Sequence, residues 1–249
     1  MAGRAYSTEA VVLRSIRIGE ADRVLHLYTC AHGRVGAVAK GVRRTMSRFG
    51  GRLEPLSHVE LVLHRGRGEL ETVTAAQLVH SHREAREDYY RLSVGLIGAE
   101  AMLRLFSEQE ANERAFTAVT RFLDLLDDEP HTADRPALDP LGLSFQLKLL
   151  WLSGYLPHVS GCAECGAADE QLVGYSPRSG GAVCARCAAR TEALALGADG
   201  IAGVAALLAR PLADAAGLEL SERARRDALR VVTASYEFHG GFRLRTLSA

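Results

Sequence analysis

Long apolar stretches are missing from this sequence. It contains no run of about 18 apolar residues, the length that a membrane-spanning helix requires. Residues 1–10 include no apolar stretch before Glu9, so they do not resemble a secretory signal. We therefore expect a cytoplasmic protein without a membrane segment. With 47% hydrophobic and 24% charged residues, the 249-residue chain is typical of a globular protein with one large domain or two smaller ones.

The common enzymatic motifs are also missing. The chain has no P-loop lysine motif, no GxGxxG motif, no nucleophile elbow and no HExxH motif. Asp124, Asp127, Asp128 and Glu129 cluster at the end of a predicted helix and would permit a metal-dependent nuclease. They lie beside a proline-containing linker, however, so solvated charge is the simpler interpretation. We expect that the protein is not an enzyme.

An excess of charge of one sign is missing as well, which by itself argues against a nucleic-acid-binding protein. The chain holds 30 Lys and Arg residues and 30 Asp and Glu residues. The balance changes along the sequence: residues 1–82 hold 12 basic and 7 acidic residues, residues 83–160 hold 8 and 13, and the remainder holds 10 and 10. This asymmetry predicts that the first third meets a polyanion.

Cysteine is scarce, but four of the five cysteines form two matched pairs. Cys162 and Cys165 form one CxxC motif, Cys184 and Cys187 form the other, and 18 residues separate the pairs. Two CxxC turns can place four thiolates around Zn²⁺ at about 2.3 Å, and this spacing is in the range of zinc sites. The sequence therefore predicts a structural zinc ion. Four protein ligands would leave no coordination position for catalysis.

Other interpretations of the cysteine pairs stay open at this point. An iron–sulfur cluster can use four cysteines, but no redox domain surrounds these. Two disulfides conflict with a reducing cytosol, and four unliganded thiols would not explain the matched spacing. His158 could replace one cysteine as a ligand. The fifth cysteine, Cys30, lies in a predicted strand and is most simply a core residue.

The pattern of apolar residues changes near residue 82. Before it, short alternating segments with turn residues between them predict five strands, at 8–18, 24–29, 35–42, 58–64 and 70–79. Five such strands favour a small barrel of the OB type. After residue 83 the period becomes helical, with helices expected near 89–106, 116–126, 141–153, 198–209 and 221–238. The predicted architecture is α+β: an OB-fold domain at 1–82, then a mainly helical domain at 83–249 with a zinc module at about 160–190.

Basic residues concentrate in the predicted barrel. No acidic residue interrupts residues 34–52, whose segment 43–56 is expected to be a mobile loop. Lys and Arg bind phosphates and release counterions, so we expect DNA contacts that depend on salt. The candidate DNA-binding residues are Arg14, Arg17, Arg34, Lys40, Arg43, Arg44, Arg48, Arg52, Arg65 and Arg67. Tyr28 and Phe49 are the main candidates for stacking against bases.

Several motifs resemble those of the RecO family of bacterial DNA repair and recombination mediators. In the first half they are the GEADR turn at 19–23, the HGRVGAVAKGVRR segment at 32–44, the SRFGGRLEP loop at 47–55 and the strand ending in RGRGEL. In the second half they are YLPHVSGCAECGA at 155–167 and YSPRSGGAVCARCA at 175–188. The resemblance runs from about residue 8 to the C-terminus and keeps the order of the elements.

The resemblance implies a function that composition and spacing do not give. It implies an N-terminal OB fold and a helical domain that carries the zinc module. It also implies binding of single- and double-stranded DNA, annealing of complementary strands, and loading of RecA onto DNA coated by single-stranded DNA-binding protein. RecR, RecF and single-stranded DNA-binding protein are the implied partners, at the nucleoid. The alternatives are a zinc-ribbon accessory factor that binds RNA or protein, and the metal-dependent nuclease.

Overall fold

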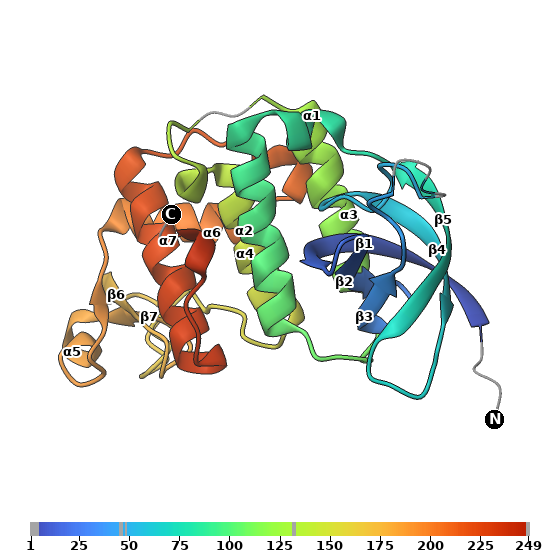
Figure 1. The fold of residues 1–249 in the computed structure, drawn as a ribbon. Coiled ribbons are helices and arrows are strands. Elements are labelled where there is room, and N and C mark those ends of the chain that lie inside the picture. The colour runs from blue at the N-terminus through green and yellow to red at the C-terminus, as the bar shows by residue number, and fades with distance from the viewer. Residues whose placement is uncertain (1–4, 45–46, 48, 131–132, 248–249) are drawn as a thin grey trace. The chain divides into compact units, whose positions relative to one another are not determined.

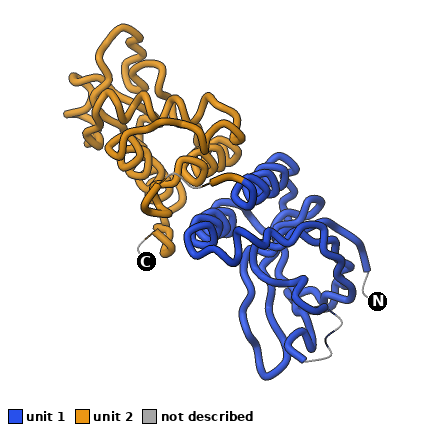
Figure 2. The backbone as a smooth tube through the Cα atoms, turned by 90° about the horizontal axis from the view of Figure 1, so that it is seen from above, with its two compact units in different colours: residues 1–128 blue, residues 129–249 orange. Residues whose placement is uncertain are grey.

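A computed structural model describes residues 5–44, 47, 49–130 and 133–247 of the protein. The chain divides into two compact units, residues 1–128 and 129–249 (Figure 2). The first unit therefore contains the β-rich segment together with the helices that directly follow it. The domain boundary expected between residues 82 and 83 stays a prediction, because a division by packing does not test it.

Five strands form a closed barrel at the start of the first unit (Figure 1). Their order around the barrel is β1-β2-β3-β5-β4, in which β1 is antiparallel to both β2 and β4, and β3 is parallel to β5. This five-stranded arrangement is OB-like, as predicted. The strands are Ala5–Ile18 (β1), Asp22–Thr29 (β2), Gly33–Ala39 (β3), His58–His64 (β4) and Glu71–His80 (β5).

Strand β1 closes the barrel because it belongs to two sides of it. The first part of its 14 residues pairs with β4 and the later part pairs with β2. Its register against β2 shifts between Val12 and Arg14. An irregularity of this kind bends a strand and increases its twist. Strands β3 and β4 show alternating burial, so one face of each strand lies in the core.

The segment between β3 and β4 contributes to the barrel core. Phe49 and Leu53 are each only 1% exposed and belong to the apolar cluster inside the barrel. Arg23 of β2 also holds the segment through an ion pair with Glu54 at 2.9 Å. The expectation of a mobile loop is therefore wrong for these residues, because two apolar side chains and an ion pair fix them to the barrel.

Three helices complete the first unit, namely α1 (Arg83–Glu87), α2 (Tyr89–Leu105) and α3 (Glu113–Asp128). Asp88 and Asn112 cap α2 and α3, because each side chain accepts a backbone N–H bond from the first turn, at 2.8 and 3.0 Å. The end of α2 packs on the barrel, where the ring of Phe106 meets the ring of Tyr28 edge-on at a centroid distance of 5.5 Å.

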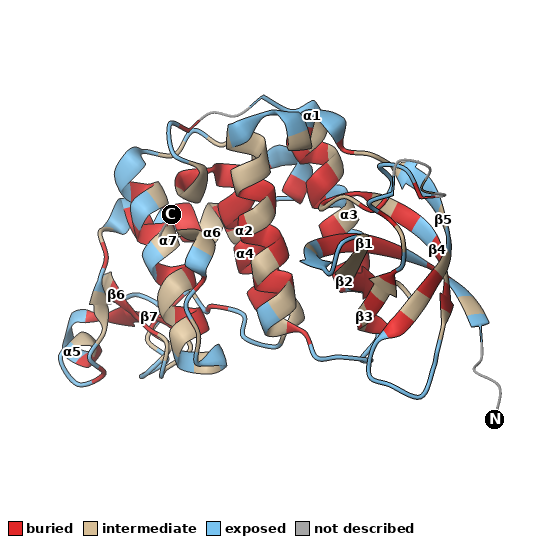
Figure 3. Ribbon diagram, viewed as in Figure 1, coloured by how far each residue is buried: buried red, intermediate tan, exposed pale blue. Residues whose placement is uncertain are grey.

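The second unit is mainly helical, as predicted. Its long helices are α4 (Pro140–Leu152), α6 (Ala198–Ala209) and α7 (Glu222–Ser235), and α7 continues into a π-helical turn at Tyr236–Gly240. Helix α4 is buried on nearly all sides, which its uniformly apolar sequence predicts (Figure 3). Ser221 caps α7 as expected, since its hydroxyl accepts the N–H of Ala224 at 3.1 Å.

A small sheet follows α4, where the sequence predicts only a zinc-binding segment. Its strands lie in the order β7-β6-β8, and the short helix α5 follows β7. The bounds are Leu172–Ser176 (β6), Gly181–Cys184 (β7), Ala185–Ala188 (α5) and Leu194–Ala195 (β8). The hydroxyls of Tyr175 and Ser235, 2.8 Å apart, connect the sheet to α7.

No helix in the described part of the chain is long and apolar enough to cross a bilayer.

Candidate metal centre and nucleic-acid interface

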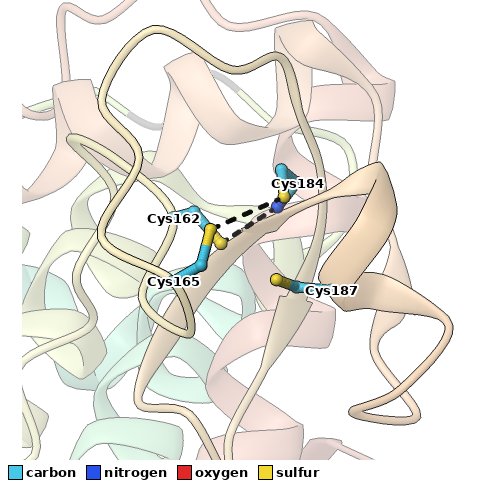
Figure 4. Close-up of side chains that lie close together, drawn as sticks. All are labelled: Cys162, Cys165, Cys184 and Cys187. Atoms are coloured by element: carbon cyan, nitrogen blue, oxygen red, sulfur yellow. Dashed lines mark hydrogen bonds between the residues drawn. The ribbon is translucent and has the colours of Figure 1, made fainter.

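The four paired cysteines come together at the β7 edge of the small sheet, where the segment with the first pair hydrogen-bonds to β7. Cys162 and Cys165 lie on the segment that precedes β6, Cys184 is the last residue of β7, and Cys187 is in α5 (Figure 4). Gly166, with a φ of 74°, follows the first pair and donates its N–H to the carbonyl of Cys162 at 2.8 Å. A residue without Cβ adopts this left-handed conformation readily, so the turn can bring the first two sulfurs to the second pair.

The sulfur atoms are close enough to share one ion. All four Sγ atoms lie within 4.8 Å of one another, and those of Cys165 and Cys184 are 4.0 Å apart. All four are free thiols, which excludes the disulfide alternative in this structure. Cys162, Cys184 and Cys187 are buried, whereas Cys165 is exposed. The four cysteines could therefore hold a metal ion, and four sulfur ligands would complete a tetrahedral site.

Backbone N–H groups favour the ionised form of one of these thiols. Burial raises the pKa of Cys162, but backbone N–H groups that point at its sulfur, first that of Cys184 at 3.4 Å, lower the pKa to about 6. Burial and the neighbouring sulfurs raise the pKa of Cys187 to about 12. A bound cation would offset the repulsion between neighbouring thiolates, since metal ions bind cysteine in its ionised form.

The apolar core around the cysteines is small. Among the described residues its buried members are Val183 and three of the cysteines, and partly buried aliphatic side chains pack around them. Such a core buries little apolar area, so it contributes little free energy of folding. A bound ion would supply the free energy of folding that this small core does not. His158 is not needed as a substitute ligand, because four sulfurs already converge.

Half of the candidate DNA-binding residues project from the barrel without an acidic partner. These residues are exposed and form no ion pair with any described residue; they are Arg14, Arg17, Lys40, Arg44 and Arg67. Arg17, Lys40 and Arg44 flank the turn between β1 and β2, because hydrogen bonds hold the segment at the end of β3 against that turn. The N–H of Gly41 is 2.7 Å from Asp22 Oδ1, and the N–H of Arg43 is 3.0 Å from the carbonyl of Ala21.

The other candidates have contacts within the chain. Arg65 pairs with Glu71 at 3.0 Å, and Arg43 and Arg52 donate to backbone carbonyls, although the side chains of all three are exposed. Arg34 is the most enclosed of them: it donates to the carbonyls of Leu103 and Phe106 and to Glu108 at 2.9 Å. It thereby satisfies carbonyls at the C-terminal end of α2. Arg48 lies outside the described residues.

The segment that follows α2 pairs with the edge of β3 near its first residues, where the N–H of Gln109 is 3.1 Å from the carbonyl of Arg34. Glu108 forms a bridge beside Arg34, and the backbone of Glu110 lies against Gly33. Gly33 has a φ of 64°, and a Cβ there would come within 2.0 Å of the Glu110 carbonyl oxygen, so no other residue fits. Among the described residues, three of the five unpaired basic side chains are therefore at the β1–β2 turn, and this acidic segment contacts the opposite end of β3.

The expected stacking residues are not available to bases. Tyr28 is fully buried beneath α2, and Phe49 lies in the barrel core. The prediction that these rings stack against bases is wrong, because both are used in packing. The charged half of the predicted interface is exposed, and the aromatic half is not.

The acids that raised the nuclease alternative are not all solvated. Asp128 and Glu129 are exposed, but Asp127 is mostly buried, and its Oδ1 accepts the N–H of Ala85 at 2.7 Å. Asp124 contacts two histidines. Solvated charge is thus the wrong interpretation for Asp124 and Asp127.

Comparisons with known proteins agree with the arrangement of the two halves. A family model described as recombination protein O N terminal matches residues 1–82, and one described as recombination protein O C terminal matches residues 86–248. A protein named DNA repair protein RecO from Rubrobacter xylanophilus is 40% identical over 225 residues, or 89% of this chain and 88% of the relative. Another so named, from Frankia casuarinae, is 37% identical over 242 residues, or 94% and 93%.

Proposed function

The chain belongs to the RecO family of DNA repair proteins, and from that membership we propose that it binds single- and double-stranded DNA and anneals complementary strands. In this proposal it works with RecR, and with RecF, to load RecA onto DNA coated by single-stranded DNA-binding protein. It acts at the nucleoid in the cytoplasm. The single observation that carries the DNA-binding part is the set of exposed basic side chains on an OB-like barrel without acidic partners among the described residues.

Annealing by such a surface requires no bond-making step. Two complementary strands repel each other through their phosphates, and a cationic surface lowers that repulsion and releases counterions. Because contacts of Lys and Arg with phosphates carry no base information, we expect little sequence preference. We therefore propose that the protein is not an enzyme.

Zinc is the proposed ligand of the cysteine site. The donor set fits it, because four thiolates suit a tetrahedral ion of borderline softness. Cys162, Cys165, Cys184 and Cys187 would hold the ion, and its role would be to fold the small sheet. An iron–sulfur cluster would use the same donors. The colour and iron content of the purified protein distinguish the two.

Fluorescence annealing tests the proposed function. Labelled complementary oligonucleotides, bare or coated with single-stranded DNA-binding protein, are mixed with the protein at several salt concentrations. We expect faster pairing, an intact strand on a denaturing gel, and activity that survives brief EDTA treatment. No acceleration would overturn the proposal. Cleaved DNA that disappears in EDTA would favour the nuclease alternative, and stronger competition by RNA than by DNA would favour the accessory factor.

A further inference from the structure

Two histidines and an aspartate from separate elements meet beside the barrel. His80 is the last residue of β5, His82 lies in the connection to α1, and Asp124 is in α3. Asp124 Oδ1 is 3.0 Å from His80 Nδ1 and 3.0 Å from His82 Nε2, and the imidazole centroids are 4.2 Å apart. One potential ligand atom from each residue lies within 4.8 Å of the other two. This cluster is in the first unit, whereas the cysteine site is in the second.

The hydrogen bond on the far side of His82 fixes its tautomer. His82 is fully buried, and its Nδ1 is 2.7 Å from the carbonyl oxygen of Leu56. A carbonyl only accepts, so Nδ1 carries the proton, and a neutral ring then has a lone pair on Nε2. That lone pair faces a carboxylate oxygen of Asp124, which is also an acceptor. Two acceptors 3.0 Å apart require a cation between them, either a proton or a metal ion.

More donor atoms converge here than one shared proton can join, because one ligand atom each from His80, His82 and Asp124 lies within 4.8 Å of the other two. A second imidazole, that of His80, also turns a nitrogen toward the same carboxylate oxygen. Histidines that bind metals usually donate their other N–H to a carbonyl or carboxylate, and His82 has that arrangement with Leu56.

The backbone holds both partners of this hydrogen bond in an uncommon conformation. His82 has a φ of 43° and Leu56 a φ of 68°, and neither is glycine. Such left-handed residues are uncommon and cost free energy, and they cluster at sites where the surrounding structure imposes them. Here the conformation directs one imidazole nitrogen at a carbonyl and the other at α3.

We propose that His80, His82 and Asp124 bind one divalent transition metal ion of the zinc class, at a site separate from the four cysteines. Two imidazoles and a carboxylate are ligands that such ions accept, and three protein ligands leave a position for water. The ion would fasten the end of β5 to α3. Asp127 supports the site, since it lies 3.7 Å from His80 Nε2 while it holds α1 through Ala85. The H-x-H spacing of the histidines is a sequence signal for it.

Metal titration of the whole protein tests this site. The cysteine site is first loaded with zinc, free metal is removed, and Zn²⁺ is added in a calorimeter at pH 7.5. We expect wild type to bind one further equivalent. With Co²⁺ as the probe, the added ion should give ligand-field absorption without the thiolate charge-transfer band of a cysteine site.

Matched variants test whether a metal ion or a proton lies between His82 and Asp124. Asp124→Asn removes the anionic ligand, but its amide can donate to His82 Nε2, so the fold has a substitute contact; we expect loss of the further equivalent. Asp128→Asn makes the same change in charge at an exposed position of α3, and the equivalent should remain. His80→Asn gives a second test at a half-exposed position if Asp124→Asn unfolds. The proposal is overturned if wild type takes up no further metal, or if Asp124→Asn or His80→Asn binds it as wild type does.

Discussion

Five exposed basic residues on the barrel and three exposed arginines at the C-terminal end of the chain differ in their partners. At the C-terminal end, Arg226 pairs with Glu222 at 2.5 Å, Arg230 with Asp227 at 3.1 Å and Arg243 with Glu237 at 2.5 Å. On the barrel, a comparable group pairs with no acid among the described residues; its members are Arg14, Arg17, Lys40, Arg44 and Arg67. A guanidinium that is already paired with a carboxylate attracts a phosphate less strongly than an unpaired one. The number of arginines in a region is therefore a weaker guide to DNA binding than the number left unneutralised.

From this comparison we expect DNA contact in the first unit, and from the proposed zinc site we expect metal-dependent folding in part of the second. Replacing Cys165 by Ser should cause the largest effect, the loss of the ion and of the fold of the small sheet. Apparent binding free energies of structural zinc are about 10–16 kcal/mol, so a missing ligand costs several kcal/mol. Elemental analysis and thermal unfolding measure the change. Cys30→Ser is the matched control and should keep its zinc. Equal zinc content in both variants would contradict the assignment.

The next effect concerns the barrel surface. Replacing Arg17, Lys40 and Arg44 together by Ala should weaken DNA binding by on the order of a hundredfold at 0.1 M salt, and lower the salt slope by about 2 to 3, if each contacts a phosphate. Fluorescence anisotropy at four salt concentrations gives both quantities. If affinity and slope stay unchanged, the β1–β2 end of the barrel does not contact DNA.

Arg34 extends the comparison to a basic residue of the barrel that is bonded within the chain. Its guanidinium is bonded to the end of α2 and to Glu108, so Arg34→Ala should lower the free energy of unfolding by about 1–3 kcal/mol. The salt slope of DNA binding should not change. Urea denaturation measures the first quantity and anisotropy the second. A slope reduced by about 1 would show that Arg34 contacts a phosphate after all.

The smallest effect is expected from the paired arginines. Changing Arg226, Arg230 and Arg243 together to Ala removes as many charges as the barrel variant, yet DNA affinity should stay within about twofold because these charges are already neutralised. Exposed ion pairs contribute about 0.2–1 kcal/mol each, so the loss of stability is small at Arg226 and Arg243, whereas the loss of Arg230 costs more because it leaves the buried carboxylate of Asp227 without its cation. A fall in affinity equal to that of the barrel variant would break the comparison.

Local patterns in the sequence predict much of the fold. Alternating apolar residues predict the barrel strands, the uniformly apolar sequence of α4 predicts its burial, and the CxxC spacing predicts that four sulfurs meet. Ser221 is recognisable as a cap because its position before a helical period is a local feature.

Contacts between distant residues could not be predicted in the same way. Tyr28 is an aromatic residue in a strand of alternating apolar and polar residues, and its burial depends on Phe106, which lies far along the chain. Phe49 and Leu53 lie in a polar, glycine-containing segment, and their burial depends on the closed barrel. The small sheet was missed because strands of two to five residues have no clear period. Asp124 meets His80 only after three helices have folded back.

The backbone of Glu110 against Gly33 sets a limit on how a polynucleotide can lie on this protein. A strand that follows the barrel from the β1–β2 turn along β3 would run into the chain's own main chain and the nearby carboxylate of Glu108. We expect few nucleotides to be held at once, toward the low end of the range of about 4–16 for an OB fold. A contact of that length would dissociate readily, which suits the proposed annealing because the finished duplex has to be released.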